Sequence, residues 1–243
     1  MHRPVPSALG VVCALLLASG GAATLRAQEV GHDPDSSPYH DLDAKHDFSL
    51  FAGYWHAGKD LAGVAPRSGP LLGIRYDLLL GKSPVFLVGR FTHVIDDRSV
   101  IDPTLPASIR VLNPSQPAAL NIIDGGFGVQ LTGHKTFHRL APVINVGAGL
   151  VTDFGGLGGP GHYHLGNQFA FTYGGGVRWI PGGPLSRLLI RGDLNNYMYD
   201  HHYPTSYHTL TADGSSAIPF LKPLAAWRNN GAFTLGVWYS FLR

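Results

Sequence analysis

Residues 229–243 have the sequence NNGAFTLGVWYSFLR, in which every second position from Phe233 is apolar. The positions between them are mostly small or polar, as at Thr234 and Ser240. Alternation with a period of two residues is the pattern of a β-strand with one apolar face. The stretch therefore predicts a strand over residues 230–241. Its apolar face is formed by Phe233, Leu235, Val237, Tyr239 and Phe241.

The same period recurs in eight segments of the chain, and no segment shows a helical period of comparable strength. A tilted strand crosses a bilayer in roughly 9–11 residues, and each segment is near that length or a little longer. Most prolines fall between the segments, Pro114 and Pro117 among them, as expected because proline interrupts strand pairing. The predicted strands are residues 47–57, 70–80, 84–95, 120–133, 141–152, 167–179, 186–199 and 230–241.

The connections between these segments alternate between long and short without exception. An up-and-down meander gives this pattern when long loops project at one end and tight turns close the other. The last strand can then pair with the first, around residues 48–55, and remove both free edges of the sheet. The sequence thus predicts an all-β fold, an eight-stranded antiparallel up-and-down transmembrane β-barrel over residues 47–243.

The composition indicates which face of these strands meets lipid. Charged residues make up 14% of the chain, against about 25% for soluble domains. The face opposite the apolar one carries glycine, asparagine, glutamine and threonine, rather than the lysine and glutamate of a water-facing surface. We therefore expect the apolar face to contact lipid and the other face to fill the barrel. The few charges on it predict a paired interior network of Arg75, Asp77, Arg90, Asp124, Arg178, Arg191 and Asp193.

The first residues have the order of a secretory signal peptide. A short basic start precedes the apolar run LGVVCALLLA, residues 9–18, and a stretch of small residues follows it. We predict a signal peptide over residues 1–27, cleaved after Ala23 or Ala27, and a flexible periplasmic leader over residues 28–46. Cys13, the single cysteine, lies in the signal peptide. The mature chain therefore offers no disulfide and no cysteine metal site.

The stretch FAFTYGGGVRWIPGGPLSRLLIRGDLNNYMY, residues 169–199, resembles part of the small OmpA-like bacterial outer-membrane β-barrel proteins. It has their glycine-rich strand, tight turn and R-x-D-x-x-x-Y strand. The terminal GVWYSF, residues 236–241, is similar to the last strand of such barrels, which commonly ends on an aromatic residue, whereas Leu242 and Arg243 follow it here. The resemblance covers most of the chain after the signal peptide, and we expect no peptidoglycan-binding domain.

The resemblance implies an integral protein of the Gram-negative outer membrane that contacts lipid and lipopolysaccharide and is inserted by the barrel assembly machinery. It implies a structural role, or surface binding through long extracellular loops. A formal charge of +2 at pH 7 argues against nucleic acid as a partner. We expect a monomer without a cofactor.

Two enzymatic alternatives fit parts of the sequence. In DHHYPTSYH, residues 200–208, a histidine oriented by Asp200 would activate Ser206, as in palmitoyltransferase barrels. An omptin-like protease would place Asp96–Asp97 opposite Asp200–His201, but omptins have ten strands. The lipid A deacylase barrel uses a glutamate, which the predicted barrel lacks. A polar surface loop explains residues 200–208 without catalysis, so we predict no catalytic residue and no enzymatic activity.

Two further alternatives concern metal and transport. The pairs His162–His164 and His201–His202 offer imidazoles, but no third ligand follows at a fixed spacing, so no metal site is predicted. The interior arginines and aspartates form either a structural plug or the lining of a narrow, porin-like path for small solutes. An eight-stranded interior is nearly filled by side chains, which favours the plug.

Overall fold

The computed structural model describes residues 37–42, 45–81, 83–181 and 187–241. The predicted signal peptide, residues 1–27, lies outside these ranges, and so does the start of the expected leader, residues 28–36. Within the described ranges, eight strands form a ring in which neighbours pair antiparallel. They are β2 (His46–His56), β3 (Gly69–Leu79), β4 (Val85–Ile101), β5 (Val111–Gln130), β7 (Leu140–Thr152), β10 (Asn167–Trp179), β11 (Leu188–His202) and β12 (Ala225–Phe241).

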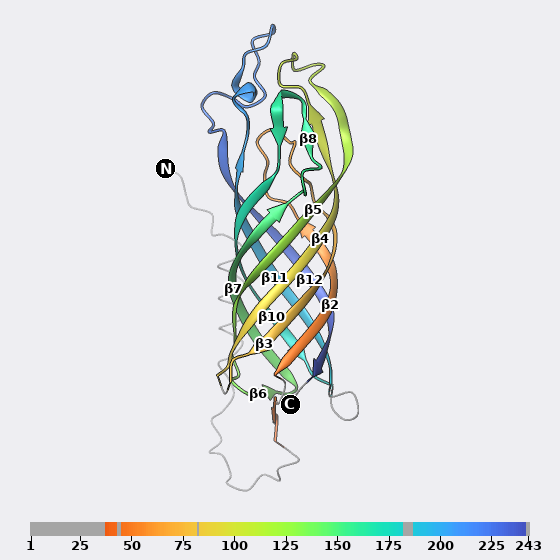
Figure 1. Ribbon diagram of the computed structural model, residues 1–243, viewed down its shortest axis with the longest axis vertical. Helices are drawn as coiled ribbons and strands as arrows, with labels where there is room; N and C mark the ends of the chain where they lie inside the picture. The colour runs from red at the N-terminus through yellow and green to blue at the C-terminus, as the bar shows by residue number, and fades with distance from the viewer. Residues whose placement is uncertain (1–36, 43–44, 82, 182–186, 242–243) are drawn as a thin grey trace, which may run out of the picture. The chain divides into compact units, whose positions relative to one another are not determined.

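The ring closes between its last and first strands. β12 lies antiparallel to β2, with Trp238 opposite Ser49 and Phe233 opposite Tyr54. Each of the other strands pairs with the strands before and after it around the ring, so the order is that of a meander (Figure 1). The predicted all-β, eight-stranded, antiparallel up-and-down barrel is confirmed.

The two ends of the ring differ. The connections at residues 57–68, 102–110, 153–166 and 203–224 lie at one end, which we call the loop end. It includes the two-stranded ribbon of β8 (Gly158–Gly159) and β9 (Tyr163–His164), at the top of Figure 1. The connections after β3, β5 and β10 lie at the opposite end, the turn end, together with the start of β2 and the end of β12.

The strands extend further at the loop end than the sequence predicted. β4 and β5 have 17 and 20 residues, and the pairing of Arg98 with Gln116 continues their ladder outside the ring. The prediction that Pro114 and Pro117 fall between strands is wrong, because both lie in β5. Residues 111–120 pair with β4 alone, since β7 begins to pair at Asn121. Proline is tolerated there because one edge of the strand is unpaired.

A short strand precedes the ring. β1 (Tyr39–Asp41), within the expected flexible leader, pairs with β6 (Lys135–Phe137) at the turn end. The Leu42 backbone N–H donates to the His134 carbonyl at 2.7 Å, and Thr136 is buried. This part of the expected leader is therefore held by backbone hydrogen bonds, and β2 begins at His46, one residue before the predicted barrel boundary.

Two interior glycines show how closely the wall packs against its contents. A Cβ on Gly176 of β10 would lie 2.3 Å from Asp193 Oδ1. A Cβ on Gly149 of β7 would lie 2.5 Å from the Cβ of Asp124. Real Cβ contacts are not this short, so only glycine leaves room for the two carboxylate side chains at these positions.

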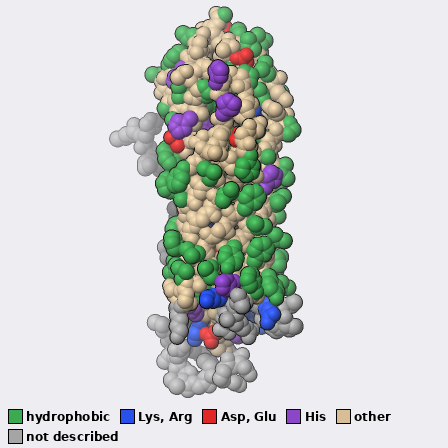
Figure 2. Space-filling view, viewed as in Figure 1, with side chains coloured by type: hydrophobic (Ala, Val, Ile, Leu, Met, Phe, Trp, Pro, Cys, Tyr) green, Lys and Arg blue, Asp and Glu red, His purple; other side chains and the backbone are tan. Residues whose placement is uncertain are grey.

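The outer surface of the ring is apolar. Outward side chains such as Leu50, Val146 and Leu194 are more than 60% exposed, and Figure 2 shows hydrophobic side chains distributed along the visible wall. The two short helices of the described chain, η2 (Pro160–His162) and η4 (Thr205–His208), lie in the loops. Among the described residues, no helix is long and apolar enough to cross a membrane.

Candidate functional site

A network of ion pairs fills the barrel near the turn end. Asp77 of β3 accepts hydrogen bonds from three arginines: from Arg75 Nε at 2.8 Å, from Arg178 Nη2 at 2.6 Å and from Arg191 Nη1 at 3.2 Å. Arg191 also pairs with Asp193 at 2.5 Å. All five side chains are almost completely buried, so each charge is balanced by a partner rather than by water.

Aromatic rings enclose these guanidinium groups. The ring of Trp238, on β12, lies 4.9 Å from the guanidinium carbon of Arg191, 5.1 Å from that of Arg75 and 5.4 Å from that of Arg178. The ring of Phe86, on β4, lies 4.7 Å from the guanidinium carbon of Arg178. Cations over aromatic faces are attracted by the ring quadrupole, and more strongly when desolvated.

A second cluster lies further along the barrel. Arg90 pairs with Asp124 at 2.7 Å, and its Nη1 donates to Asn195 Oδ1 at 2.8 Å. Asn145 donates to the same Asn195 oxygen at 3.2 Å. Four strands, β4, β5, β7 and β11, thus supply side chains to one hydrogen-bonded group.

The structure places all seven sequence-predicted network residues inside the barrel. It adds Asp47, which pairs with Arg178 at 3.3 Å and accepts a hydrogen bond from Ser240 at 2.7 Å. Asp47 lies on the same strand face as Ser49, two residues later, which could have indicated that it points inward. Because the predicted strand 47–57 has apolar residues on both faces, the sequence did not show which face is the inner one. Four arginines and four aspartates then balance one another in Arg75, Arg90, Arg178, Arg191, Asp47, Asp77, Asp124 and Asp193.

Beyond the ion pairs, toward the loop end, an apolar plug fills the interior. Every strand of the ring contributes a buried side chain to this one cluster, and two loop residues join it. The members are between 0% and 8% exposed. The plug comprises Trp55, Leu71, Val94, Ala118, Leu120, Ile122, Val151, Leu157, Leu165, Ala170, Tyr197, Tyr199 and Ala232.

The loops at the loop end pack over the plug. Tyr163, Tyr203 and Tyr207 form a second buried cluster with apolar residues of the loops at 57–68 and 203–224 and with Ile101 at the end of β4. Burial raises the pKa of all three phenols above the ordinary value. The Tyr163 hydroxyl lies 3.3 Å from Nε2 of His201, which is fully buried. These loops therefore form an ordered cap.

Asp60 fixes the first of these loops. Its Oδ2 accepts the backbone N–H of Ala65 at 2.6 Å, and its Oδ1 accepts that of Ala62 at 3.3 Å. The Tyr203 hydroxyl, from a loop far along the chain, also donates to Asp60. One carboxylate thus joins the loop of residues 57–68 to the loop of residues 203–224.

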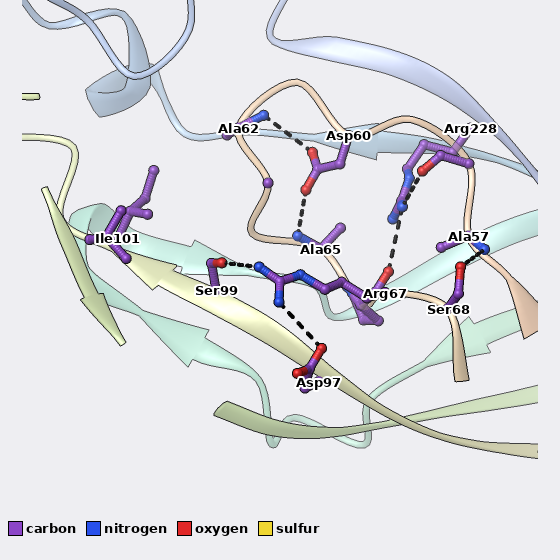
Figure 3. A pocket seen from close by; sticks show the side chains of 14 residues that line it. Ala57, Asp60, Ala62, Ala65, Arg67, Ser68, Asp97, Ser99, Ile101 and Arg228 are labelled. Atoms are coloured by element: carbon purple, nitrogen blue, oxygen red, sulfur yellow. Dashed lines mark hydrogen bonds and ion pairs between the residues drawn. The ribbon is translucent and has the colours of Figure 1, made fainter. Parts of the chain in front are cut away.

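An open groove of about 570 Å³ runs beside this loop (Figure 3). Arg67 lies in it, pairing with Asp97 at 3.5 Å and donating to Ser99. The buried Arg228 donates to the Gly58 carbonyl at 2.8 Å. Most polar groups of the groove already have partners within the protein, and small or aliphatic side chains form the rest of its wall.

No protein-family model matches the chain. No curated protein matches it either.

Solved structures with a similar arrangement of strands include three surface or membrane proteins. Neisserial surface protein A shares 11% identity over 81% of this chain and 97% of its own, with a TM-score of 0.47. The attachment invasion locus protein Ail of Yersinia pestis was solved with the heparin analogue sucrose octasulfate. It shares 12% identity over 81% of this chain and 99% of its own, with a TM-score of 0.35. A major outer membrane protein of Thermus thermophilus shares 13% identity over 81% of this chain and 99% of its own, with a TM-score of 0.36.

The two aspartates considered for an omptin-like site face opposite ways on β4. Asp96 belongs to the inward series of β4, and both its oxygens are buried without a hydrogen-bond partner. Asp97 faces outward and pairs with Arg67. Asp200 lies 3.4 Å from His202, while the partner of His201 is Tyr163.

Two other side chains of residues 200–208 also have partners outside that stretch. Ser206 donates to the Gly161 carbonyl at 2.6 Å, and His208 Nε2 lies 3.0 Å from the Lys222 carbonyl. His164 pairs through its backbone with Gly158. In the part of the chain that the structure describes, no three His, Cys, Asp or Glu side chains are grouped to hold a metal ion.

Sequence reasoning missed two buried arginines at the loop end, Arg98 and Arg228. Both lie in strand extensions beyond the predicted limits at residues 95 and 230. Arg98 donates to the Gly158 carbonyl and lies over the ring of Tyr163 at 5.5 Å. The alternation that identified the strands stops at the end of the apolar outer face, so it gave no signal for these inward positions.

Proposed function

We propose that the protein is an integral, non-enzymatic protein of the bacterial outer membrane, with lipid around its wall and a loop end that contacts molecules at the cell surface. The resemblance to small OmpA-like barrels supports this proposal. The proposed partners are membrane lipid and lipopolysaccharide, with the barrel assembly machinery acting during insertion. The proposed state in the membrane is a monomer.

The observation that carries the proposal is the inverted distribution of side chains. Large apolar residues on the outer wall are between 37% and 64% exposed, while arginines and aspartates are buried inside. Proteins in water rarely expose contiguous apolar patches larger than a few hundred Å². A closed barrel with an apolar exterior satisfies its backbone hydrogen bonds and places the apolar side chains in lipid.

The plug supports a closed barrel rather than a pore. Ions cross apolar constrictions poorly, because such constrictions dewet. The described interior passes from the ion-pair network to a cluster to which all eight ring strands contribute. The charges below the plug are already paired with one another, which favours a structural role for the network.

The ordered cap supports surface binding. Its loops are held by Asp60, the tyrosine cluster and the strand extensions, so they present a fixed shape. A fixed surface binds with less loss of conformational freedom than a flexible one. The groove beside Arg67 is the concave part of this surface that we propose as a contact site.

Reconstitution tests the proposal. The purified protein should require detergent, should shift its gel mobility on heating, and should produce no stepwise current in planar bilayers. A variant carrying Trp55→Ser and Leu120→Ser, with its plug opened, should show current under the same conditions and is the matched control. A native protein that stays soluble without detergent would refute the membrane proposal. A steady current through the unmodified protein would refute the closed barrel.

A further inference from the structure

At the turn end of the barrel, exposed basic side chains outnumber exposed acidic ones. Among the described residues, four exposed basic side chains lie there, and Asp41 is the one exposed acid. At the loop end, the acidic side chains that are not buried outnumber the basic side chains that are not buried. Figure 2 shows most of the visible lysine and arginine side chains at the lower end of the wall. We call the basic set Lys45, Lys135, Arg139 and Arg187 the basic rim.

Two arginines of this rim lie directly beside the apolar wall. Arg139 precedes the exposed Leu140 at the start of β7, and Arg187 precedes the exposed Leu188 at the start of β11. The backbone carbonyls of both arginines accept hydrogen bonds from neighbouring strands, at 2.9 Å in each case. Among the described residues, no ion pair neutralises either guanidinium.

Aromatic side chains lie on the outer face of the wall at the level of these arginines. Trp179 pairs with Leu140 across β7 and β10, and Tyr239 pairs with Leu188 across β11 and β12. Both rings are exposed, by 44% and 46%. Tryptophan and tyrosine prefer the level of lipid headgroups, because their rings are apolar with one polar edge.

The paired strands β1 and β6 continue the same face. Phe137 pairs with Leu140 and Tyr39 pairs with Phe137, so all three side chains share the outward side. The rings of Tyr39 and Phe137 lie 5.5 Å apart and are exposed. Thr136, on the opposite side of this strand pair, is buried. The strand pair therefore adds two aromatic side chains just below the apolar wall.

We infer that the sector of the basic rim formed by Arg139 and Arg187, with Trp179 and Tyr239, binds the headgroups of anionic phospholipids in the leaflet at the turn end. Arginine presents donors that match phosphate oxygens in pairs. Its aliphatic stem can lie along apolar surface while its charge reaches the headgroup. This inference rests on the proposed membrane location and adds a lipid preference to one end of the barrel.

Spin-labelled lipids test the inference. The full protein is inserted into phosphatidylcholine vesicles containing a trace of spin-labelled phosphatidylglycerol or phosphatidylcholine, and the fraction of immobilised label is measured. Each basic residue near an anionic surface favours binding by about fivefold. The ratio of the two association constants should therefore exceed one in low salt and should fall toward one in 1 M salt, because salt screens the charges.

Matched variants locate the effect. R139Q with R187Q should reduce the ratio about fivefold or more, whereas R139K with R187K should retain it because the charge is kept. K59Q with K222Q, at the loop end, should leave the ratio unchanged. If the glutamine variant does not fold, the salt dependence of the unmodified protein still tests the inference. A ratio of the two association constants near one at low salt would overturn it.

Other outcomes would overturn either the inference about the rim or the proposed membrane location. An equal ratio in the native protein and R139Q/R187Q would overturn the inference. Binding of inorganic phosphate to the protein in detergent, lost in R139Q/R187Q, would assign the arginines to a soluble anion and also overturn it. Failure of the protein to insert into any vesicle would instead refute the proposed membrane location. Insertion without a lipid preference would refute only the inference about the rim.

Discussion

The ring of Trp238 lies 4.9 Å from the guanidinium carbon of Arg191, inside the barrel and away from water. Trp238 is on the last strand of the ring and Arg191 on the strand before it, where Leu189 pairs with Trp238. The contact therefore joins the strand that closes the barrel to the charged interior. A residue of the last strand both closes the wall and covers the ion pairs.

Trp238→Ala should lower the stability of the barrel markedly. The change leaves a cavity beside three buried guanidinium groups and removes their aromatic contacts. Truncation of a buried tryptophan costs about 3–5 kcal/mol. Reversible urea unfolding in detergent, followed by tryptophan fluorescence and circular dichroism, measures the loss. Trp227→Ala is the control, because Trp227 is 56% exposed on the outer face and should give a smaller change.

Asp77→Asn should destabilise the barrel more than loss of a surface pair does. Asp77 accepts hydrogen bonds from three buried arginines, so the amide would leave their charge uncompensated. Breaking a buried ion pair from one side costs about 3–5 kcal/mol. The same unfolding measurement on Asp41→Asn should show a change within about 0.5 kcal/mol, because its pair with Lys135 is exposed. Equal losses in the two variants would contradict the importance of the interior network.

Gly176→Ala should prevent normal folding, whereas Gly89→Ala should be tolerated. An added Cβ at residue 176 would approach Asp193 Oδ1 to 2.3 Å, while at Gly89 it would meet nothing within 4 Å. Both glycines lie in strands of the ring, so backbone propensity acts alike on the two variants. The heat-dependent gel shift gives the folded fraction of each. A normal folded fraction for Gly176→Ala would show that the interior can move to accept the methyl group.

The alternation of apolar and polar residues was enough to predict the ring and its interior charges. It worked because an apolar outer wall and a narrow polar interior impose opposite demands on successive residues. The same reasoning could not define residues 111–117, which are exposed on both faces and carry two prolines. Beyond the apolar wall the strands no longer have one apolar face, so the sequence period that identifies a strand is lost.

The cap at the loop end was beyond prediction for a different reason. His201 and Ser206 were considered as reactive groups because they lie close together in sequence. Their partners in the structure, Tyr163 and the Gly161 carbonyl, come from another loop. Such contacts depend on how separate loops pack together, which a local pattern does not contain. Asp60 and Tyr203 illustrate the same point at greater sequence separation.

Tyr203→Phe should loosen the first loop without unfolding the barrel. The change removes the hydroxyl that donates to Asp60 and also accepts the Leu61 backbone N–H at 3.2 Å. A buried group left unpaired costs about 1–3 kcal/mol, so the amides of Ala62 and Ala65 should exchange roughly 5- to 150-fold faster. Hydrogen–deuterium exchange measures this rate. Tyr54→Phe is the control, because Tyr54 is exposed on the barrel wall and should leave these amides unchanged.

Acidification should release the contact between two loops through Asp213. Hydrogen bonds from Thr211 at 2.5 Å, Ser215 at 2.7 Å and the Ala107 backbone N–H at 2.8 Å lower the pKa of Asp213 below the ordinary value of 3.8. Because the folded pKa is depressed, the stabilising effect is fully present above pH 3.8 and is lost as the pH falls through the folded pKa.

The Ala107 amide reports this loss directly. Its NMR chemical shift should stay constant from pH 7 to about pH 4 and change only at lower pH, because the carboxylate remains ionised until then. In Asp213→Asn the acid-dependent change should disappear, since no group at this position titrates. An Ala107 shift that moves near pH 4 or above in the native protein would show that the carboxylate is not held by these hydrogen bonds. The contact between residues 102–110 and 203–224 would then depend on Arg110, which donates to Ser215 Oγ at 2.7 Å.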